Sequence, residues 1–368
     1  MSGSGTAVPR VLVAPDKFKG SLAAPRVAQA LAEGVRRVRP DALVDCLPVA
    51  DGGDGTLDAV VASGFERVEV VADGPTGEPV ATAYARRDAT AVVEMADACG
   101  LVRLPGGALA PMDASSRGLG QVMAAALDAG CRDLVVGIGG SASTDGGVGM
   151  LVALGALVDD GHLDLAGMHP GLAEARVVVA CDVDNPLTGP DGAAAVYGPQ
   201  KGASREQVAV LDERLTRWAD LVAAATGADR RDEPGAGAAG GVGFGLVAVL
   251  GAELRPGIAL VLDLVGFAGR VAGSRLVVTG EGSLDEQSLR GKAPVGVSAA
   301  AGAVGAPVVA VCGRNLLTDR QLAEAGIVRA YALTDLEPDV SVCLREPARL
   351  LADLGERIAR EHLGWVAG

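Results

Sequence analysis

The fold class is decided by the stretch DLVVGIGGSASTDGG (residues 133–147), in which an apolar run of strand length ends in glycines and hydroxyl residues. Most of five further apolar runs end in similar clusters of Gly, Asp, Ser or Asn, and helical patterns separate the runs. This alternation is typical of α/β proteins with parallel sheets, which place their ligand sites at the strand ends. The further runs are VLVAP near residue 11, AVVEMA near 91, VVVACDVDN near 177, LVVTGEG near 276 and PVVAVCG near 307.

The length of 368 residues, with 49% hydrophobic content, suggests two domains or one large one. Residues 65–95 read as short strands joined by turns, which marks a change of architecture, and strand-helix alternation returns after about Ser274. We therefore expect two α/β domains with the active site in the cleft between them. Residues 1–75 plus 272–368 are predicted to form a discontinuous Rossmann/flavodoxin-like parallel-sheet domain, and residues 76–271 a second, mixed α/β domain inserted between.

Composition excludes several classes of function. The formal net charge of −14 argues against a nucleic-acid partner, because nucleic-acid binders present basic surfaces. Residues 234–252 and 293–313 are long and almost uncharged, but their Gly and Ala content predicts buried helices with a neighbouring strand or loop, and no membrane partner. The first residues lack a secretory pattern, the six cysteines form no CxxC pair, and the three histidines lack zinc-ligand spacing. We expect a cytoplasmic protein with reduced thiols; the sequence leaves the oligomeric state open, with a homodimer as one option.

Two candidate segments lie near the amino terminus. APDKFKGSL (residues 14–22) reads as a strand end followed by a helix whose start Ser21 could cap, an arrangement that presents backbone N–H groups to an anion. ADGGDGT (residues 50–56) combines glycines, which allow close backbone approach, with aspartates that could hold Mg²⁺. An ordinary strand-to-helix turn and an Asp-Gly hairpin are the structural alternatives. The candidate binding residues are Asp16, Lys19, Ser21, Gly52 and Gly53, with Asp51 as a catalytic candidate and Asp54 as a metal ligand.

The glycine-rich segment after the strand at residue 133 allows two readings. Gly137, Gly139 and Ala142 match the dinucleotide pattern G-x-G-x-x-A, with Asp159 or Asp160 near the offset of a ribose-binding acid. However, glycines continue where a Rossmann helix would pack apolar residues, so we favour a phosphate cradle of hydroxyls and N–H groups. The residues assigned to this cradle are Ser141, Ser143, Thr144 and Asp145.

Two later segments carry acids, an amide and lysines. ACDVDNPLTG (residues 180–189), with YGPQKG just downstream, places acids and an amide at a strand end, although an Asx turn stopped by Pro186 is an equal alternative. GEGSLDEQS (residues 280–288) with GKA places acids, hydroxyls and a lysine after another strand. Glu286 and Ala293 exclude a Walker P-loop there. The candidates are Asp182, Asn185, Lys201, Glu281, Ser283, Asp285, Gln287 and Lys292.

Lysine usage supports these segments. Only four of the 32 basic residues are lysine, and all four lie in the segments just described. A compact ammonium suits a phosphate or carboxylate at close quarters, whereas arginine presents a planar fork. The four lysines are Lys17, Lys19, Lys201 and Lys292.

Taken together, APDKFKGSL, ADGGDGT, GIGGSASTDGGVGM, ACDVDNP, GPQKGA, PGAGAAGG and GEGSLDEQSLRGKAP resemble the bacterial glycerate kinases of the first type. The resemblance runs from about Val11 to the last helix, and the order and spacing of the motifs make it specific. It departs from the family at Lys17, where serine is more usual, and in a shortened stretch at residues 158–176. It implies a two-domain α/β enzyme that uses ATP and Mg²⁺ to phosphorylate D-glycerate, with 2-phosphoglycerate favoured over 3-phosphoglycerate.

The expected mechanism is positioning plus charge neutralisation. Lys19, Lys201 and Lys292 are expected to hold anions. Which aspartate accepts the hydroxyl proton and which organises Mg²⁺ stays open among Asp51, Asp182 and Asp285. Asp182 is also a candidate metal ligand, and Lys292 a candidate catalytic residue. An NAD(P)-dependent dehydrogenase of a small hydroxy acid and a non-catalytic nucleotide-binding protein are the alternatives.

Overall fold

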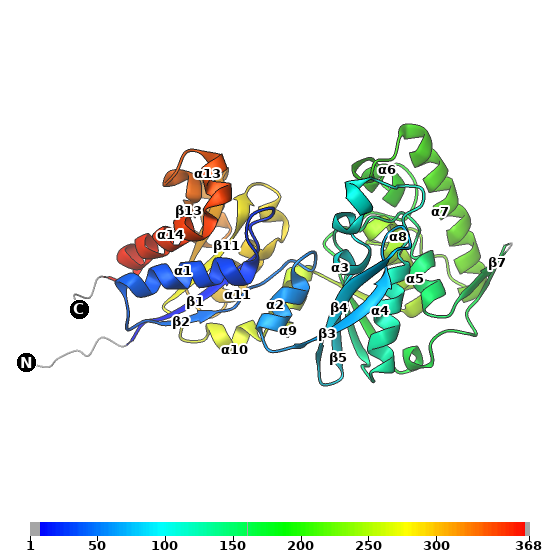
Figure 1. Cartoon of the computed structure of the whole chain (residues 1–368), viewed down its shortest axis with the longest axis horizontal. Helices are drawn as coiled ribbons and strands as arrows, with labels where there is room; N and C mark the ends of the chain where they lie inside the picture. The colour runs from blue at the N-terminus through cyan, green and yellow to red at the C-terminus, as the bar shows by residue number, and fades with distance from the viewer. Residues whose placement is uncertain (1–7, 160, 365–368) are drawn as a thin grey trace, which may run out of the picture. The chain divides into compact units, whose positions relative to one another are not determined.

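The computed structural model describes residues 8–159 and 161–364, and the chain divides into two compact units (Figure 1). The first unit contains the chain up to Asp51, Asp58–Ser63 and the chain from Ile258 on; the second contains Gly52–Leu57 and Gly64–Gly257. Asp160, one of the two acids proposed for a dinucleotide site, lies outside the described residues.

The first unit is built on a five-stranded, fully parallel sheet with the order β13-β12-β11-β1-β2. The register of its two central strands pairs Pro15 with Gly280, so both strands end at the same edge of the sheet. The alternation of strands and helices along the sequence requires this parallel arrangement. Its strands are β1 (Arg10–Pro15), β2 (Leu43–Cys46), β11 (Leu276–Leu284), β12 (Val308–Asn315) and β13 (Ile327–Ala332).

Helices cover both faces of this sheet, because successive side chains of a strand point to opposite faces. Val309 and Val311 pack with α1 and α14, whereas Ala310 and Cys312 pack with α12 on the other face. Figure 1 shows α1 and α14 side by side. The helices that belong to this unit are α1 (Ala24–Val38), α10 (Phe267–Val271), α11 (Ala293–Gly302), α12 (Asp319–Glu324), α13 (Val340–Arg345) and α14 (Pro347–His362), while α2 (Thr56–Ala62) and α9 (Gly257–Leu264) include residues of both units.

The predicted cap of α1 is wrong. The helix begins at Ala24, its N-cap residue is Ala23, and no side chain caps it. Ser21 lies two residues before the cap position, because Phe18 and Leu22 form an isolated bridge and the Ser21 N–H donates to the Phe18 carbonyl at 2.9 Å. Pro25 fixes the first turn instead, where a missing N–H has no consequence.

The second unit contains a six-stranded mixed sheet with the order β10-β9-β6-β5-β4-β3. The pairs from β10 to β5 are parallel, and those from β5 to β3 are antiparallel, which confirms the change of architecture predicted between residues 65 and 95. A separate antiparallel hairpin, β7 (Leu157–Asp159) and β8 (His162–Asp164), contains Asp159. The sheet strands are β3 (Glu66–Asp73), β4 (Pro79–Arg87), β5 (Thr90–Glu94), β6 (Asp133–Gly137), β9 (Arg176–Ala180) and β10 (Glu253–Arg255).

One large apolar core holds the second unit together. Alternate strand residues such as Val93, Val136 and Val179 pack with side chains of α4, α5, α7 and α8. The 22-residue helix α7 begins with a capping box in which Ser204 and Gln207 satisfy each other's backbone N–H groups. The helices are α3 (Met95–Cys99), α4 (Arg117–Asp128), α5 (Val148–Ala153), α6 (Ala193–Tyr197), α7 (Arg205–Thr226) and α8 (Ala238–Leu250).

All six apolar runs identified in the sequence form strands, and the two long uncharged stretches contain α8 and α11 as predicted. Among the described residues, no helix combines the length and apolar character needed to cross a membrane. The strands that sequence patterns did not reveal are short or carry exposed side chains; they are β2, β7, β8, β10 and β13.

Candidate functional site

The first unit places an acid at the carboxyl end of each of its two central strands. Asp16 follows β1 and is held there because its backbone N–H donates to the Gly280 carbonyl at 2.8 Å. Glu281 lies one residue further along β11. At Gly282 a Cβ atom would stand 3.3 Å from the Lys19 backbone nitrogen, so glycine lets the Lys19 loop approach β11 closely.

The carboxyl groups at these strand ends repel one another. Burial raises the pKa of Asp16 to about 7, with Asp51 and Glu281 adding to the increase and Lys17 opposing it. Burial likewise raises the pKa of Glu281, opposed by Ser288 and Lys292 and reinforced by Asp285 and Asp51. Glu281 Oε1 is buried and has no hydrogen-bond partner among the described residues. A cation in this cluster would therefore favour the ionised carboxylates.

Lys292 and Asp285 differ in what they contact. Lys292 precedes α11, and its Nζ lies 3.9 Å from Glu281 Oε2, close enough to form an ion pair. Asp285 Oδ1 accepts the backbone N–H groups of Gln287 at 2.9 Å and Ser288 at 3.3 Å, so its carboxylate shapes the turn after β11. Ser283 offers its carbonyl to the Ser288 hydroxyl at 3.3 Å.

The sequence candidates in the first unit thus fall into two groups. The cluster at the ends of β1 and β11 brings together Asp16, Asp51, Glu281, Asp285 and Lys292. Lys19 and Gln287 are exposed, and Ser21 and Ser283 are partly exposed beside the cluster.

In the second unit, the loop between β6 and α5 is organised by Asp145. Asp145 Oδ2 accepts hydrogen bonds from the backbone N–H and the hydroxyl of Ser116, both at 2.8 Å. Its other oxygen accepts the Gly147 N–H at 3.2 Å. This carboxylate therefore fixes the shape of the glycine-rich loop.

Lys201 is buried beneath the same loop, with an exposed fraction of 2%. Its ammonium donates to Ser141 Oγ at 2.8 Å and to the Ser143 carbonyl, and both acceptors are neutral. Burial lowers the pKa of Lys201 to about 8, although Asp145 at longer range opposes this decrease. A third N–H of the ammonium has no acceptor among the described residues, so an anion could complete its shell.

Two hydroxyls of this loop lack partners. Ser143 Oγ and Thr144 Oγ1 are buried with no hydrogen-bond partner among the described residues. The segment Ala239–Gly241, in the left-handed conformation at all three positions, packs at Gly240 against the backbone of Ser143 and Thr144. At Gly240 a Cβ would lie 2.1 Å from the Ser143 carbonyl oxygen, so only glycine permits this contact. Buried hydroxyls without partners destabilise the free protein, which is typical of groups reserved for a ligand.

A cavity of about 230 Å³ adjoins the loop at Thr144 and Asp145. Its other walls are largely apolar, and the Arg214 guanidinium spans it by donating to the Met112 carbonyl at 3.2 Å. The Trp218 indole, also in the wall, donates to the Gly146 carbonyl at 3.0 Å and so ties α7 to the loop. The apolar wall includes Pro111, Met112, Val148, Leu211, Leu215 and Trp218.

Gly52 and Gly53 of the segment ADGGDGT pack closely within the second unit. A Cβ at Gly52 would lie 2.4 Å from Ala180 Cβ at the end of β9, and one at Gly139 would lie 2.7 Å from the Gly53 Cα. These glycines therefore have a packing role. Asp54 lines a cavity of about 260 Å³ together with Glu94 and Asp97.

Asp182 and Asn185 follow β9 in the same unit. Asp182 Oδ1 accepts the Gly257 N–H at 2.8 Å. The Asn185 side chain accepts from the Tyr197 hydroxyl at 2.6 Å and donates to the Asp191 carbonyl at 2.9 Å. Asn185 therefore holds this loop in shape through both ends of its amide.

Sequence reasoning missed Glu94, which ends β5. Its carboxylate accepts the N–H groups of Gly55 at 3.1 Å and Leu57 at 2.9 Å, and burial raises its pKa to about 7. The sequence signal for Glu94 is an acid within the apolar run AVVEMA (residues 91–96), which contains no other charged residue. Arg214 and Trp218 were also missed, because they lie on a long helix without any loop motif.

Within residues 8–159 and 161–364, no three His, Cys, Asp or Glu side chains form a group suited to holding a metal ion by themselves. Mg²⁺ in kinases is commonly held by one or two carboxylates together with substrate phosphates and water, an arrangement that needs no such group. The orphaned oxygen of Glu281 and the mutual repulsion around Asp16 fit a cation of that kind.

The comparison with solved structures agrees with this arrangement. A crystal structure of a protein from Salmonella typhimurium LT2, described as a glycerate kinase 2, matches with a TM-score of 0.84 and 37% identity, over 96% of this chain and 98% of that one. The fold and its strand-end clusters of acids, lysines and glycines thus define an α/β phosphotransferase that acts on an alcohol group.

The chain belongs to the glycerate kinase family, whose model matches residues 11–363. A glycerate kinase of Bacillus subtilis (strain 168) is 41% identical over 96% of both chains. A glycerate 2-kinase of Escherichia coli (strain K12) is 40% identical over 88% of both. The predicted family and the predicted kinase activity are therefore confirmed, and the dehydrogenase and non-catalytic alternatives are set aside.

Proposed function

We propose that this glycerate kinase transfers the γ-phosphoryl group of ATP to the C2 hydroxyl of D-glycerate in the cytoplasm, giving 2-phosphoglycerate, with Mg²⁺ as cofactor. The observation that carries the proposal is the pair of strand-end clusters, one acidic and one built around a buried lysine. The name of the Escherichia coli relative, glycerate 2-kinase, supports the choice of the C2 hydroxyl.

The loop of the second unit is assigned to the nucleotide. Lys201 lacks a contacting carboxylate, so a phosphate oxygen would supply its counter-charge. The backbone N–H groups and hydroxyls of residues 141–147 complete a cradle of the kind that binds phosphate. A phosphate near Ser143 and Thr144 would give their unpartnered hydroxyls an acceptor.

The adjoining cavity is assigned to the nucleobase. Its volume of about 230 Å³ and its apolar walls suit a flat aromatic ring, and the Arg214 guanidinium can stack on such a ring. The carboxylate of Asp145 at the cavity's edge disfavours a phosphate there but can accept from a ribose hydroxyl. The base and ribose therefore occupy this cavity in the proposal.

The acids of the first unit are assigned to proton transfer and to the metal. When bound, Mg²⁺ would neutralise phosphate charge, with Asp16 and Glu281 as the residues that would hold it directly or through water. A carboxyl with a pKa of about 7 is also poised to accept a proton at neutral pH, which makes Asp16 a base candidate beside Asp51. Lys292 would orient the transferring group or the glycerate carboxylate. The metal roles of Asp54 and Asp182 and the catalytic role of Asp285 stay predictions.

The experiment is a substrate panel. The full chain is incubated with ATP, Mg²⁺ and D-glycerate, L-glycerate, lactate or tartronate, ADP release is followed, and phosphorus and proton NMR identify the product. We expect ADP release that needs D-glycerate and stops with EDTA, and a phosphate ester on C2. A 3-phosphoglycerate product would overturn the regiochemistry, and turnover only with another acid would overturn the substrate.

A further inference from the structure

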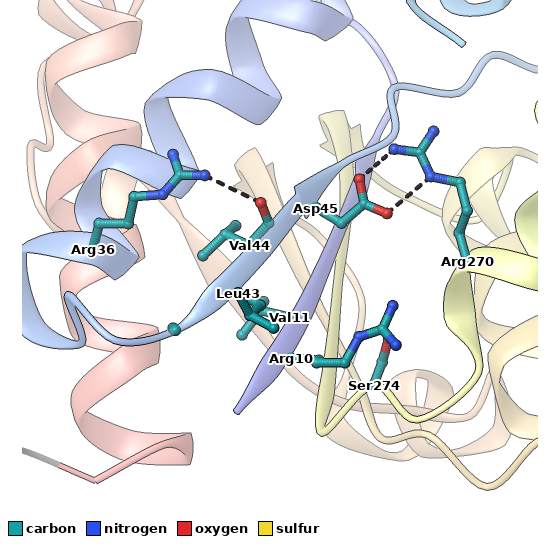
Figure 2. A pocket seen from close by; sticks show the side chains of 9 residues that line it. Arg10, Val11, Arg36, Leu43, Val44, Asp45, Arg270 and Ser274 are labelled. Carbon is teal, nitrogen blue, oxygen red and sulfur yellow. Dashed lines mark hydrogen bonds and ion pairs between the residues drawn. The ribbon is translucent and has the colours of Figure 1, made fainter. Parts of the chain in front are cut away.

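A basic cavity lies in the first unit, away from the acids and lysines assigned to the reaction. It has a volume of about 410 Å³ and lies at the amino end of β1 and along the edge strand β2 (Figure 2). Asp16 is at the other end of β1, six residues from Arg10, which corresponds to roughly 20 Å in an extended strand. A molecule bound here would therefore not be the one that reacts.

The charge of the cavity is opposite to that of the chain. Three arginines and one aspartate line it, which gives a local net charge of about +2 in a protein whose formal charge is −14. Like charges brought together in an otherwise acidic protein raise its free energy unless an anion neutralises them. The charged residues are Arg10, Arg36, Arg270 and Asp45, and Ser274 adds a hydroxyl.

Two of the arginines are already held in place. Arg270 donates from Nε to Asp45 Oδ2 at 2.8 Å and from its NH2 nitrogen to Asp45 Oδ1 and to the Cys46 carbonyl. Arg36 donates to the Val44 carbonyl at 3.1 Å. Figure 2 shows both guanidinium groups converging on β2 from opposite sides. Such fixed side chains lose little conformational entropy when a ligand binds.

Most of the guanidinium donors remain available. A guanidinium has five N–H groups. The NH1 nitrogen of Arg270 and all but one donor of Arg36 have no acceptor among the described residues. Arg10 makes no side-chain hydrogen bond or ion pair within residues 8–159 and 161–364, and it lines the cavity together with Ser274 (Figure 2).

We propose that this cavity binds a small phosphorylated organic anion through Arg10, Arg36 and Arg270, as a site separate from the reaction. A phosphate monoester carries a charge of about −1.5 to −2 at pH 7, which matches the local charge, and its oxygens accept paired N–H groups from arginine. A volume of about 410 Å³ is in the range of metabolite sites and leaves room for an organic part beside the phosphate.

The test uses arginine-selective chemistry, because the cations assigned to the phosphates and to glycerate are lysines and because mass spectrometry separates the cavity arginines from Arg214. The full chain is treated with phenylglyoxal with and without 3-phosphoglycerate, at constant ionic strength, and modified arginines are mapped by peptide mass spectrometry. Glycerate serves as the control without a phosphate. We expect 3-phosphoglycerate to slow modification of Arg10 and Arg36 at least fivefold, and glycerate to have no effect. Equal modification with and without saturating 3-phosphoglycerate would overturn the proposal.

A variant locates the binding independently. Arg10→Gln/Arg36→Gln removes two exposed guanidinium groups, and Arg217→Gln/Arg320→Gln makes the same charge change on exposed helix surfaces elsewhere. In calorimetric titrations with 3-phosphoglycerate, the first variant should lose one binding site or bind there at least tenfold more weakly. The control should match the unaltered chain within about twofold. Unchanged binding by the first variant, or an equal loss in both, would contradict the assignment.

Discussion

The two strand-end clusters have opposite electrostatic defects. In the first unit, burial and mutual repulsion raise the pKa of Asp16 and of Glu281, and the nearby Lys17 and Lys292 only partly offset this increase. In the second unit, burial lowers the pKa of Lys201 to about 8, and its direct partners are neutral, so this lysine lacks an anion. The first cluster therefore favours a bound cation, and the second favours a bound anion.

The largest effect should follow from removing the lysine of the acidic cluster. We expect Lys292→Met to lower kcat/KM at least about 100-fold, because a fixed positive charge near the transferring group stabilises the transition state. Steady-state kinetics with ATP and D-glycerate measure this, and circular dichroism checks folding. Arg320→Gln on α12 is the control and should retain full activity. A loss of less than about threefold would remove Lys292 from the mechanism.

The next prediction tests how closely residues 239–241 pack against the loop that contains Ser143 and Thr144. Gly240 has φ of 70°, and an added Cβ would lie 2.1 Å from a backbone oxygen, so Gly240→Ala should lower the free energy of unfolding by about 3 kcal/mol or more. Gly302→Ala is the matched control, because no atom lies within 4 Å of its added Cβ. Urea unfolding should show little change or slight stabilisation for Gly302→Ala. Equal stability of the two variants would contradict the packing described.

The raised pKa of Asp16 predicts that the free energy of unfolding depends on pH. Because the folded-state pKa of Asp16 is raised from 3.8 to about 7, the folded protein binds this proton more tightly than the unfolded chain does. Its contribution to stability is complete below pH 4 and is lost as pH rises to about 7. Asp16→Asn should therefore flatten the fall of unfolding free energy between about pH 4 and 7.

Magnesium provides the control for that prediction. A cation held by Asp16 favours the ionised carboxylate, so Mg²⁺ should raise Tm more at pH 8 than at pH 6 in the unaltered chain. The difference should shrink in Asp16→Asn. A Mg²⁺ effect that is independent of pH, or identical in the variant, would place the metal elsewhere.

The smallest expected effect is an increase in the free energy of unfolding when a buried hydroxyl is removed. Ser143 Oγ is buried without a partner, so Ser143→Ala should raise the free energy of unfolding by about 1 kcal/mol while raising KM for ATP several-fold. Ser116→Ala should lower the free energy of unfolding, because the Ser116 hydroxyl donates to Asp145 at 2.8 Å and accepts from the Met150 N–H at 3.0 Å. Thermal unfolding compares the two. Destabilisation by Ser143→Ala would show that its hydroxyl is satisfied in the free protein.

Much of this arrangement could be predicted from the sequence. Apolar runs ending in Gly, Asp and Ser revealed the strands with their ligand-side loops, and the rarity of lysine pointed to Lys201 and Lys292. These signals are local, because a strand end and its loop are contiguous in the chain. The Ser21 cap failed because a bridge between Phe18 and Leu22 delays the helix, and such a bridge leaves no mark in local residue preferences.

The missed residues depend on contacts between distant segments. Glu94 acts on the N–H groups of Gly55 and Leu57, about 40 positions away in the chain. Trp218 reaches Gly146 from a long helix whose pattern indicates only a core face. Unpartnered hydroxyls such as Ser143 Oγ are likewise a property of three-dimensional packing.

Proton uptake on binding MgATP at pH 8.5 tests the central claim most directly. At that pH a lysine with a pKa of about 8 is mostly neutral, and a bound phosphate would restore its charge, whereas Asp16 is already ionised. Calorimetry in buffers of different ionisation enthalpy should show uptake of roughly half a proton, which disappears in Lys201→Met. No uptake, or the same uptake in Lys201→Met, would contradict the account.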